Sequence, residues 1–366
     1  MTPEKAGEKI FHHEYLLKFS RDILHAAGFS DENGLLAARV LIEADLRGID
    51  SHGVARIPGY LRLLKAGRAN PNPRIQLVHE TPGTGLIDGD KGLGLNVGPK
   101  AMEIAIKKAR HTGTGWVAVK NSNHFGIAAY HAMKALEHNM IGIAMTNASP
   151  IVSPTFSKSR LLGTNPICFV APAKQEPPFV MDMSTTTAAN GKLEILQRAG
   201  KETPHGWVQD KDGNEAIDPF ILGEGGALLP LGSDRVHSSH KGYCLGSMVD
   251  ILCGVLPGAN YGPWVPPFVA FLNPSNNPVG EGIGHFFGAI RIDAFRPAEE
   301  FKDHMDNWIR TFRNAKTVAG EAKVIIPGDP EREIAEIRRR EGIPLQEKVV
   351  TSLKNAAKEL KLSFHG

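Results

Sequence analysis

Three polar side chains repeat at four-residue spacing in the segment DSHGVARIPGY: His52, Arg56 and Tyr60. If this segment is helical, all three lie on one face. An imidazole exchanges a proton near neutral pH, and a guanidinium grips a carboxylate through two parallel hydrogen bonds. This face could assist the reduction of a small acid's carbonyl, with His52 protonating the oxygen as a hydride reaches the carbon and Arg56 holding the carboxylate. The alternative is that His52 caps a helix and Arg56 is a solvated surface charge.

A second histidine that could exchange protons lies in the loop NSNHFG, residues 121–126, between a predicted strand and a predicted helix. Such loops present ligand-binding groups in α/β proteins, so His124 is a second candidate acid/base. His131 and His138 follow at seven-residue spacing. Two helical turns separate such residues by about 10 Å, too far for one ion, and we therefore expect no metal site.

Three further polar loops, residues 163–166, 181–185 and 240–243, each follow or open a regular segment. Asp182 ends an apolar strand, where it could orient a histidine or accept a hydrogen bond from a ribose hydroxyl. Lys241 could bind a phosphate. Ordinary turn chemistry is the alternative for each loop.

Gly92, Gly94 and Gly98 lie between a predicted strand and a predicted helix, as in dinucleotide-binding Rossmann folds. The spacing is GxGxxxG instead of GxGxxG, and the next strand ends in Lys120 and Asn121 where the ribose-binding acid would stand. We therefore expect a tight turn that requires positive φ, and no Rossmann site.

The elements that must position these side chains follow from hydrophobic periodicity. Residues 16–67 predict three helices, with Ser30 capping the second and Pro58 bending the third. The middle of the chain alternates strands with a few helices, residues 191–231 show no clear pattern, and the tail from Pro327 is helical. The predicted strands are 75–80, 84–90, 115–121, 141–148, 167–173, 179–184 and 285–295, and the predicted later helices are 97–113, 126–139, 240–256 (buried) and 297–315.

Composition excludes several classes of protein. The 366 residues carry a net charge of +3, with basic and acidic residues intermixed, which disfavours a nucleic-acid-binding surface. No apolar stretch is long enough to cross a membrane, and the first residues lack a secretory pattern, so a cytoplasmic location is expected. Cys168, Cys244 and Cys253 form no metal or disulfide pattern and are expected to be small buried hydrophobes.

Eight motifs occur in the order found in one enzyme family. The motifs are DSHGVAR…Y, NSNHFG, TNASP, GTNP, MDMSTT, GWVQDKDG, LLPLG and HKGY. On these motifs the chain resembles the malate/L-lactate dehydrogenase family that is distinct from the classical lactate dehydrogenases. That family includes ureidoglycolate and sulfolactate dehydrogenases, 2,3-diketogulonate reductase and a cyclic imino acid (piperideine-2-carboxylate) reductase.

The resemblance implies an α/β fold with a non-Rossmann NAD(P)-binding domain, residues 76–311, built on a mostly antiparallel or mixed sheet. A helical domain would combine residues 1–75 with residues 312–366 from the other chain end. The implied protein is a homodimer that uses NAD, or alternatively NADP, to interconvert a small 2-hydroxy acid and a 2-oxo acid. Malate or L-lactate is the default substrate, and the acids of the other family members remain open.

The resemblance also implies residue roles. His52 resembles the general acid/base in a relay with Ser51 and Asp182, and Arg56 would bind the substrate carboxylate near Tyr60. Other members use the histidine of NHFG, so His124 competes for the same role. His240 and Asp329 depart from common family residues, which leaves the nucleotide preference open. The remaining implied substrate residues are Thr164 and Asn165, and the implied cofactor residues are His124, Phe125, Gly126, Ser149, Asp182, Met183, Ser184, Thr185, His240, Lys241, Gly328 and Asp329.

Two alternatives belong to other functional classes. A serine hydrolase could use Ser51, His52 and Asp182, but adjacent Ser and His are not expected to meet in attack geometry, and the chain has no GxSxG elbow. A noncatalytic nucleotide-binding or assembly protein would bind a dinucleotide without turnover.

Overall fold

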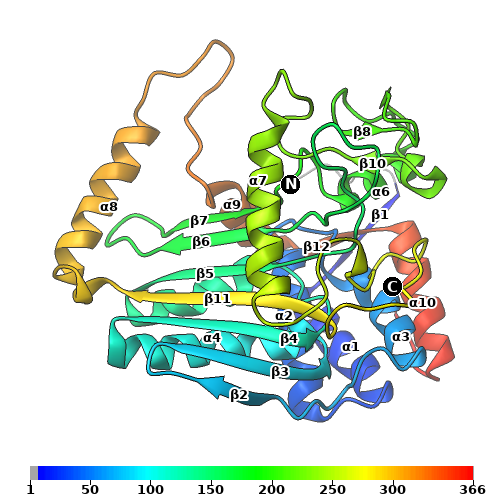
Figure 1. The fold of residues 1–366 in the computed structure, drawn as a ribbon, viewed down its shortest axis with the longest axis horizontal. Helices are drawn as coiled ribbons and strands as arrows, with labels where there is room; N and C mark the ends of the chain where they lie inside the picture. Colours follow the sequence, from blue (N-terminus) through cyan, green and yellow to red (C-terminus); the bar gives the residue numbers. More distant parts are fainter. Residues whose placement is uncertain (1–6, 366) are drawn as a thin grey trace.

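The computed structural model describes residues 7–365, which form a mixed sheet with helices on both faces (Figure 1). The seven strands are ordered β2-β3-β4-β11-β5-β6-β7. Within it β3 and β4 run parallel, and the other neighbouring pairs are antiparallel. The expected mixed, mostly antiparallel sheet is confirmed. The strands are β2 (Gln76–Glu80), β3 (Thr84–Gly92), β4 (Thr114–Ser122), β5 (Met140–Thr146), β6 (Ile167–Ala171), β7 (Phe179–Met183) and β11 (Ile283–Arg291).

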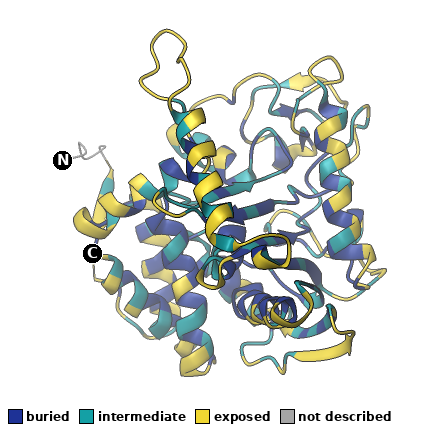
Figure 2. Cartoon of the chain, turned by 90° about the vertical axis from the view of Figure 1, so that its left-hand side faces the viewer, coloured by how far each residue is buried: buried dark blue, intermediate teal, exposed yellow. Residues whose placement is uncertain are grey.

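Both faces of the sheet are covered because its central strands carry apolar residues on both sides. Helices α4 (Gly94–Thr112) and α5 (Ala128–Ala132) pack on one face, where Met102 lies in the same buried cluster as Phe287. Helix α7 (Ser239–Asp250) crosses the opposite face, with Val249 against Ile167. Figure 2 shows the central strands largely buried inside, and the exposed residues on the outer sides of helices, in loops and on the edge strand β2.

The two chain ends meet in one helical region. Strand β1 (Glu8–Phe11) pairs antiparallel with β12 (Ile343–Gln346), and one apolar cluster contains Leu24, Leu41 and Leu353. Ser30 caps its helix as expected, accepting a hydrogen bond from Asn33 N–H (3.3 Å). The domain boundaries themselves stay a prediction. The helices of this region are α1 (His13–Ala26), α2 (Asp31–Leu46), α3 (Ile57–Lys65), α9 (Asp329–Glu341) and α10 (Glu347–Glu359).

The unassigned segment 191–231 contains short elements that pattern analysis could not resolve. Helix α6 (Asn190–Ala199) precedes a small sheet of β8 (Val208–Gln209), β9 (Glu215–Ala216) and β10 (Ala227–Leu228). Two-residue strands are too short to show alternation. Helix α8 (Ala298–Arg313) matches its predicted range, and it continues into the chain that projects at the top of Figure 1 in orange.

Two predicted helices differ from the structure. The third N-terminal helix does not run from residue 51 and bend at Pro58: a short 3₁₀ turn (Val54–Arg56) precedes α3, so Pro58 lies in the first helical turn, where its missing N–H is harmless. The helix predicted over 126–139 is a short α-helix followed by a 3₁₀ segment (Met133–His138). His131 and His138 therefore do not share one α-helical face.

The segment 240–256 is helical, but only one side of it is buried in this chain. Helix α7 continues into a π-helical turn (Ile251–Val255), and one side of both is solvent-exposed. Cys244 is also exposed, so only Cys168 and Cys253 fit the expectation of buried hydrophobes. An apolar helix can be covered by its own core or by another chain, and periodicity does not distinguish the two. The exposed apolar residues, called the α7 face below, are Tyr243, Met248, Ile251, Val255 and Leu256.

The glycine loop serves close packing, and the expectation of positive φ at its glycines is wrong. The positive φ values fall on Asp90 (47°) and Lys91 (57°). A Cβ on Gly94 would lie 2.4 Å from Phe125 Cβ, and one on Gly98 would lie 2.7 Å from the His131 ring. Phe125 thus covers the start of α4, which explains why this helix cannot receive a pyrophosphate as a Rossmann helix does.

Over residues 7–365, no helix combines the length and the apolar character that crossing a bilayer requires.

Two core histidines make stability depend on pH. His131 and His285 are fully buried, and burial lowers the pKa of His131 to about 4 and the pKa of His285 to about 3. Because both values lie below that of an unfolded histidine, acid protonates the unfolded chain first. We expect the free energy of unfolding to fall between pH 6.5 and 4, by up to about 1.4 kcal/mol per pH unit for each histidine. Urea titrations at several pH values measure this slope.

The comparison variant is His131→Leu. It should reduce the slope of the unfolding free energy against pH by about the contribution of one bound proton. An unchanged slope in His131→Leu would show that His131 does not resist protonation in the fold.

Candidate active site

The turn that carries His52 and Arg56 is held by contacts to two helices, α2 and α9. Val54 N–H donates to the buried Asp45 carboxylate of α2 (2.8 Å), and a Cβ on Gly53 would overlap that carboxylate. Arg338 of α9 binds Asp50 just before the turn. The helices from both chain ends therefore fix this segment.

Two imidazoles meet at the centre of the site. The rings of His52 and His124 are nearly parallel, with centroids 5.6 Å apart. The Ser51 hydroxyl is bonded to His52 Nδ1 (2.8 Å), and the Tyr60 hydroxyl to His124 Nδ1 (2.7 Å). In the described chain neither Nε2 atom has a hydrogen-bond partner. Neither of these two atoms is completely buried. Each ring is thus oriented through Nδ1 and keeps Nε2 for a ligand.

Both imidazoles are neutral before a ligand binds. Burial, followed by repulsion from Arg56, lowers the pKa of His52 to about 3. Burial also lowers the pKa of His124 well below its usual value, and His52 and Arg56 add to the shift. Burial raises the pKa of Tyr60, which keeps its phenol protonated as a hydrogen-bond donor. The pair can accept one proton, and that proton disfavours a second.

Phe268 belongs to the site although no sequence pattern predicted it. Its ring stacks on His124 with centroids 4.5 Å apart and lies 5.2 Å from the Tyr60 ring. The Arg56 guanidinium lies 5.9 Å from its centroid. A Cβ on Gly59 would lie only 2.6 Å from Phe268, so the glycine lets α3 approach the ring. An aromatic residue in a Pro-rich loop carries no pattern that would assign it a partner.

The guanidinium of Arg56 already holds a carboxylate. Its two terminal nitrogens donate to the two oxygens of Glu194 at 3.2 Å each, and its Nε donates to the Ser51 carbonyl. Glu194 lies on α6, in the segment where the sequence predicted no element. The expected convergence of His52, Arg56 and Tyr60 is present, with an acid that the sequence analysis missed.

Asp182 lies elsewhere in the local hydrogen-bond network. It accepts a hydrogen bond from Ala129 N–H at the start of α5 (2.8 Å), and burial raises the pKa of Asp182 to about 6. Over the described residues no hydrogen bond joins Asp182 to His52. Of the expected relay, the structure therefore contains the contact between Ser51 and His52, and the role of Asp182 stays a prediction. The Ser51 hydroxyl does reach its neighbour's imidazole, at Nδ1, but without Asp182 on His52 the three groups form no hydrolase arrangement.

The residues expected to bind substrate at the start of β6 bridge elements of the fold. Asn165 is fully buried; its amide accepts from Ala148 N–H (3.1 Å) and donates to the Gly246 carbonyl (2.9 Å). The carbonyl of Thr164 accepts from the Thr185 hydroxyl (3.1 Å). Their contacts hold β6 and β7 to α7, and their role toward substrate stays a prediction.

Several residues expected near the cofactor shape the loops around His124. Gly126 has a φ of +78° and turns its N–H toward His124 Nδ1 (3.4 Å), while Phe125 stacks on a buried histidine. Ser149 accepts a hydrogen bond from the N–H of Phe268 (2.9 Å). Ser184, after Met183, donates to the Thr186 carbonyl (3.2 Å).

Two residues expected near the cofactor, His240 and Lys241, lie at the start of α7. Lys241 is exposed in its first turn, and in the described chain its ammonium has no partner; His240 is bonded to Arg235 (2.7 Å). A free cation at a helix N-terminus fits a phosphate. By contrast, Asp329, which follows Gly328 at the start of α9, is already paired with Arg313 and Arg332. Lys241 fits the cofactor expectation, and the Asp329 carboxylate is occupied.

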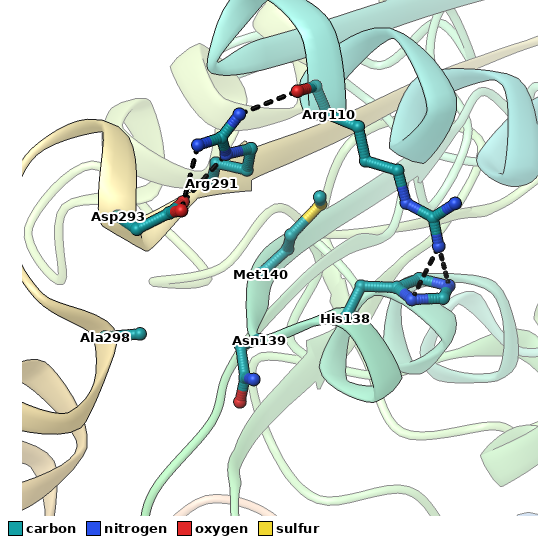
Figure 3. Close-up of a pocket in the computed structure, with 7 residues that line it drawn as sticks. All are labelled: Arg110, His138, Asn139, Met140, Arg291, Asp293 and Ala298. Carbon is teal, nitrogen blue, oxygen red and sulfur yellow. Dashed lines mark hydrogen bonds and ion pairs between the residues drawn. The ribbon is translucent and has the colours of Figure 1, made fainter.

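No group of three potential metal-ligating side chains occurs among residues 7–365. His138 lies with Arg110 and Arg291 in the pocket of Figure 3, at the start of β5 and the end of β11. His124 follows the end of the neighbouring strand β4 that is farther from this pocket. About the length of one strand therefore separates His124 from the pocket.

Comparison with known proteins agrees with this site. Residues 11–354 match the family model described as malate/L-lactate dehydrogenase. The chain is 42% identical to malate dehydrogenase of Pyrococcus abyssi over 94% of its own length and 93% of that protein. It is 38% identical to L-sulfolactate dehydrogenase of Methanocaldococcus jannaschii, over 94% and 95% of the two chains. The structure of malate dehydrogenase from Pyrococcus horikoshii superposes with a TM-score of 0.89 at 36% identity, covering 99% and 98% of the chains.

Matches of this extent, together with the mixed sheet and the paired histidines beside an arginine, assign the chain to a family and a class of reaction. It belongs to the malate/L-lactate dehydrogenase family and is a dehydrogenase of 2-hydroxy acids.

Proposed function

We propose that this enzyme transfers a hydride between NAD, with NADP as the alternative, and C2 of a small 2-hydroxy or 2-oxo acid. One observation supports this proposal above the others: two imidazoles with unpartnered Nε2 atoms lie beside a guanidinium that already binds a carboxylate. A proton donor and a carboxylate receptor are the two groups that this reaction requires from the protein.

The residues divide the work as follows. The bound nicotinamide supplies or accepts the hydride. Arg56 holds the substrate carboxylate in bidentate geometry. His52, with Nδ1 fixed by Ser51, exchanges the proton with the substrate oxygen through Nε2; His124, fixed by Tyr60, is the alternative. Phe268 excludes water from one side of His124. Lys241 contacts the cofactor phosphates.

The substrate proposed first is malate. The names of two similar proteins, malate dehydrogenase and L-sulfolactate dehydrogenase, both describe acids with a second acidic group. Lactate, ureidoglycolate, diketogulonate and cyclic imino acids are the other candidates.

A panel of 2-oxo acids, assayed with NADH and with NADPH by the absorbance of the reduced nicotinamide, tests the substrate and the cofactor together. We expect oxaloacetate to give the highest kcat/KM. Dinucleotide binding without turnover of any acid in the panel would contradict the proposed function.

We also propose that the enzyme is a cytoplasmic homodimer. The α7 face supports the dimer because five large apolar side chains are exposed along a helix that otherwise packs on the sheet. Light scattering should then give about twice the chain mass of 39.6 kDa. A monomer at micromolar concentration would contradict this proposal.

A further inference from the structure

Helix α6 lies directly on the turn that carries Arg56. A Cβ on Gly191, in its first turn, would lie 2.2 Å from Ser51 Cβ, so the glycine permits this close contact. Asn190, Glu194 and Arg198 follow at four-residue intervals and therefore share one helical face. The contact between Glu194 and Arg56 shows that this face is turned toward the site.

Glu194 binds Arg56 in the way that a substrate carboxylate would. Both of its oxygens accept from the guanidinium, and one also accepts from Asn190 Nδ2 (2.8 Å). The Arg56 side chain is only 16% exposed, whereas Glu194 is 31% exposed. Bidentate pairing of this kind leaves that edge of the guanidinium unable to receive a second carboxylate. An acid that uses Arg56 must therefore displace Glu194.

A second guanidinium is placed to receive the displaced carboxylate. Arg198 is partly buried, its Nε is fully buried, and it has no hydrogen-bond partner in the described part of the chain. It lies one turn beyond Glu194, attracted by that acid and repelled by Arg56. Glu followed by Arg four positions later is a favourable helical pair. Rotation of the Glu194 side chain could exchange one arginine for the other while α6 keeps its backbone position.

We propose that Glu194 is a specificity-determining residue: it occupies the carboxylate-binding edge of Arg56 until the acid substrate displaces it, and Arg198 then receives the displaced carboxylate. The inference rests on the proposed role of Arg56. It explains how the site selects acids, because a neutral ketone offers no carboxylate to replace Glu194. It also gives the Glu194 carboxylate an arginine partner both before and after substrate binds.

The first test is Glu194→Gln, which keeps the shape of the side chain and removes its charge. In the wild type the Glu194 carboxylate competes with the substrate for Arg56 and so lowers the apparent affinity for the substrate. Without this charge, KM for the 2-oxo acid should fall about five- to tenfold, and kcat should change much less. The affinity for oxamate, an unreactive analogue, should rise equally in calorimetry with the cofactor bound. The matched control is Glu202→Gln, which removes an exposed acid beyond α6 and should alter neither value.

The second test concerns the receiving arginine. Arg198→Met should raise KM about two- to threefold in the wild-type background and have no effect in the Glu194→Gln background, because the neutral side chain needs no new partner. Arg198→Met could still raise KM in the Glu194→Gln background, and raise it more for a dicarboxylate than for a monocarboxylate. Arg198 would then bind the substrate itself, and the proposed exchange of Glu194 between the two arginines would be refuted.

The outcomes separate this inference from the proposed function. An unchanged or higher KM in Glu194→Gln, with wild-type turnover intact, would show that Glu194 only orients Arg56 and would overturn the inference alone. A wild-type enzyme that reduces no 2-oxo acid would overturn the proposed function.

Discussion

Replacing His52 with glutamine should lower kcat by about two to four orders of magnitude while cofactor binding stays as in the wild type. Glutamine keeps a polar group beside Ser51 but cannot deliver a proton from the Nε2 position. The two imidazoles are stacked on each other, so the same substitution at His124 is the necessary comparison. Rapid-mixing kinetics measures kcat, and quenching of nicotinamide fluorescence measures cofactor binding.

The comparison between the two variants identifies the acid/base. A larger loss of kcat in His124→Gln would transfer the role from His52 to His124, and a loss below about tenfold in both would refute a histidine acid/base. The control is His138→Gln, which changes the same residue type in the pocket of Figure 3, far from the site. Its kinetic constants should equal those of the wild type.

A pH profile of kcat/KM distinguishes the loss of the acid/base from misfolding of the variant. Burial and Arg56 lower the pKa of His52, so the ligand-free imidazole is neutral at pH 7. Reduction needs the protonated form, and its kcat/KM should fall as pH rises, whereas oxidation uses the neutral form and should hold at high pH. The variant that lacks the true acid/base should lose the pH dependence of reduction.

Local patterns predicted most of the strands. They also predicted that His52, Arg56 and Tyr60 meet, although His52 precedes a 3₁₀ turn and does not lie on one helical face with the other two as the four-residue spacing predicted. The structure shows these three residues around His124, which comes from a different loop. The resemblance to a family joined those segments, since spacing alone relates only residues close in sequence.

The missed residues share one physical cause. Phe268 and Glu194 reach the site from a Pro-rich loop and from a short helix in an unassigned segment, and their roles depend on long-range packing. Gly94 and the α7 face illustrate the same limit. A glycine needed for close approach looks the same in sequence as one needed for positive φ, and an apolar helix looks the same whether its own core or another chain covers it.

Replacing Arg56 with methionine should raise KM for the 2-oxo acid about a hundredfold or more, because the substrate carboxylate loses a charged bidentate partner in a partly buried site. Lysine at this position should recover only part of the affinity, since a single ammonium cannot reproduce the planar pair of donors. Steady-state kinetics at saturating cofactor measures the effect, and cofactor affinity should not change.

The Glu194 pairing makes a further consequence measurable. In Arg56→Met the Glu194 carboxylate has only Arg198 left as a partner, and because it stays beside the binding site its negative charge repels the incoming acid, so part of the rise in KM comes from Glu194. The double variant Arg56→Met/Glu194→Gln should therefore bind the acid better than Arg56→Met alone, by about threefold to tenfold. Equal KM values in the single and double variants would show that Glu194 does not face the bound acid, and a normal KM in Arg56→Met would remove Arg56 from the site altogether.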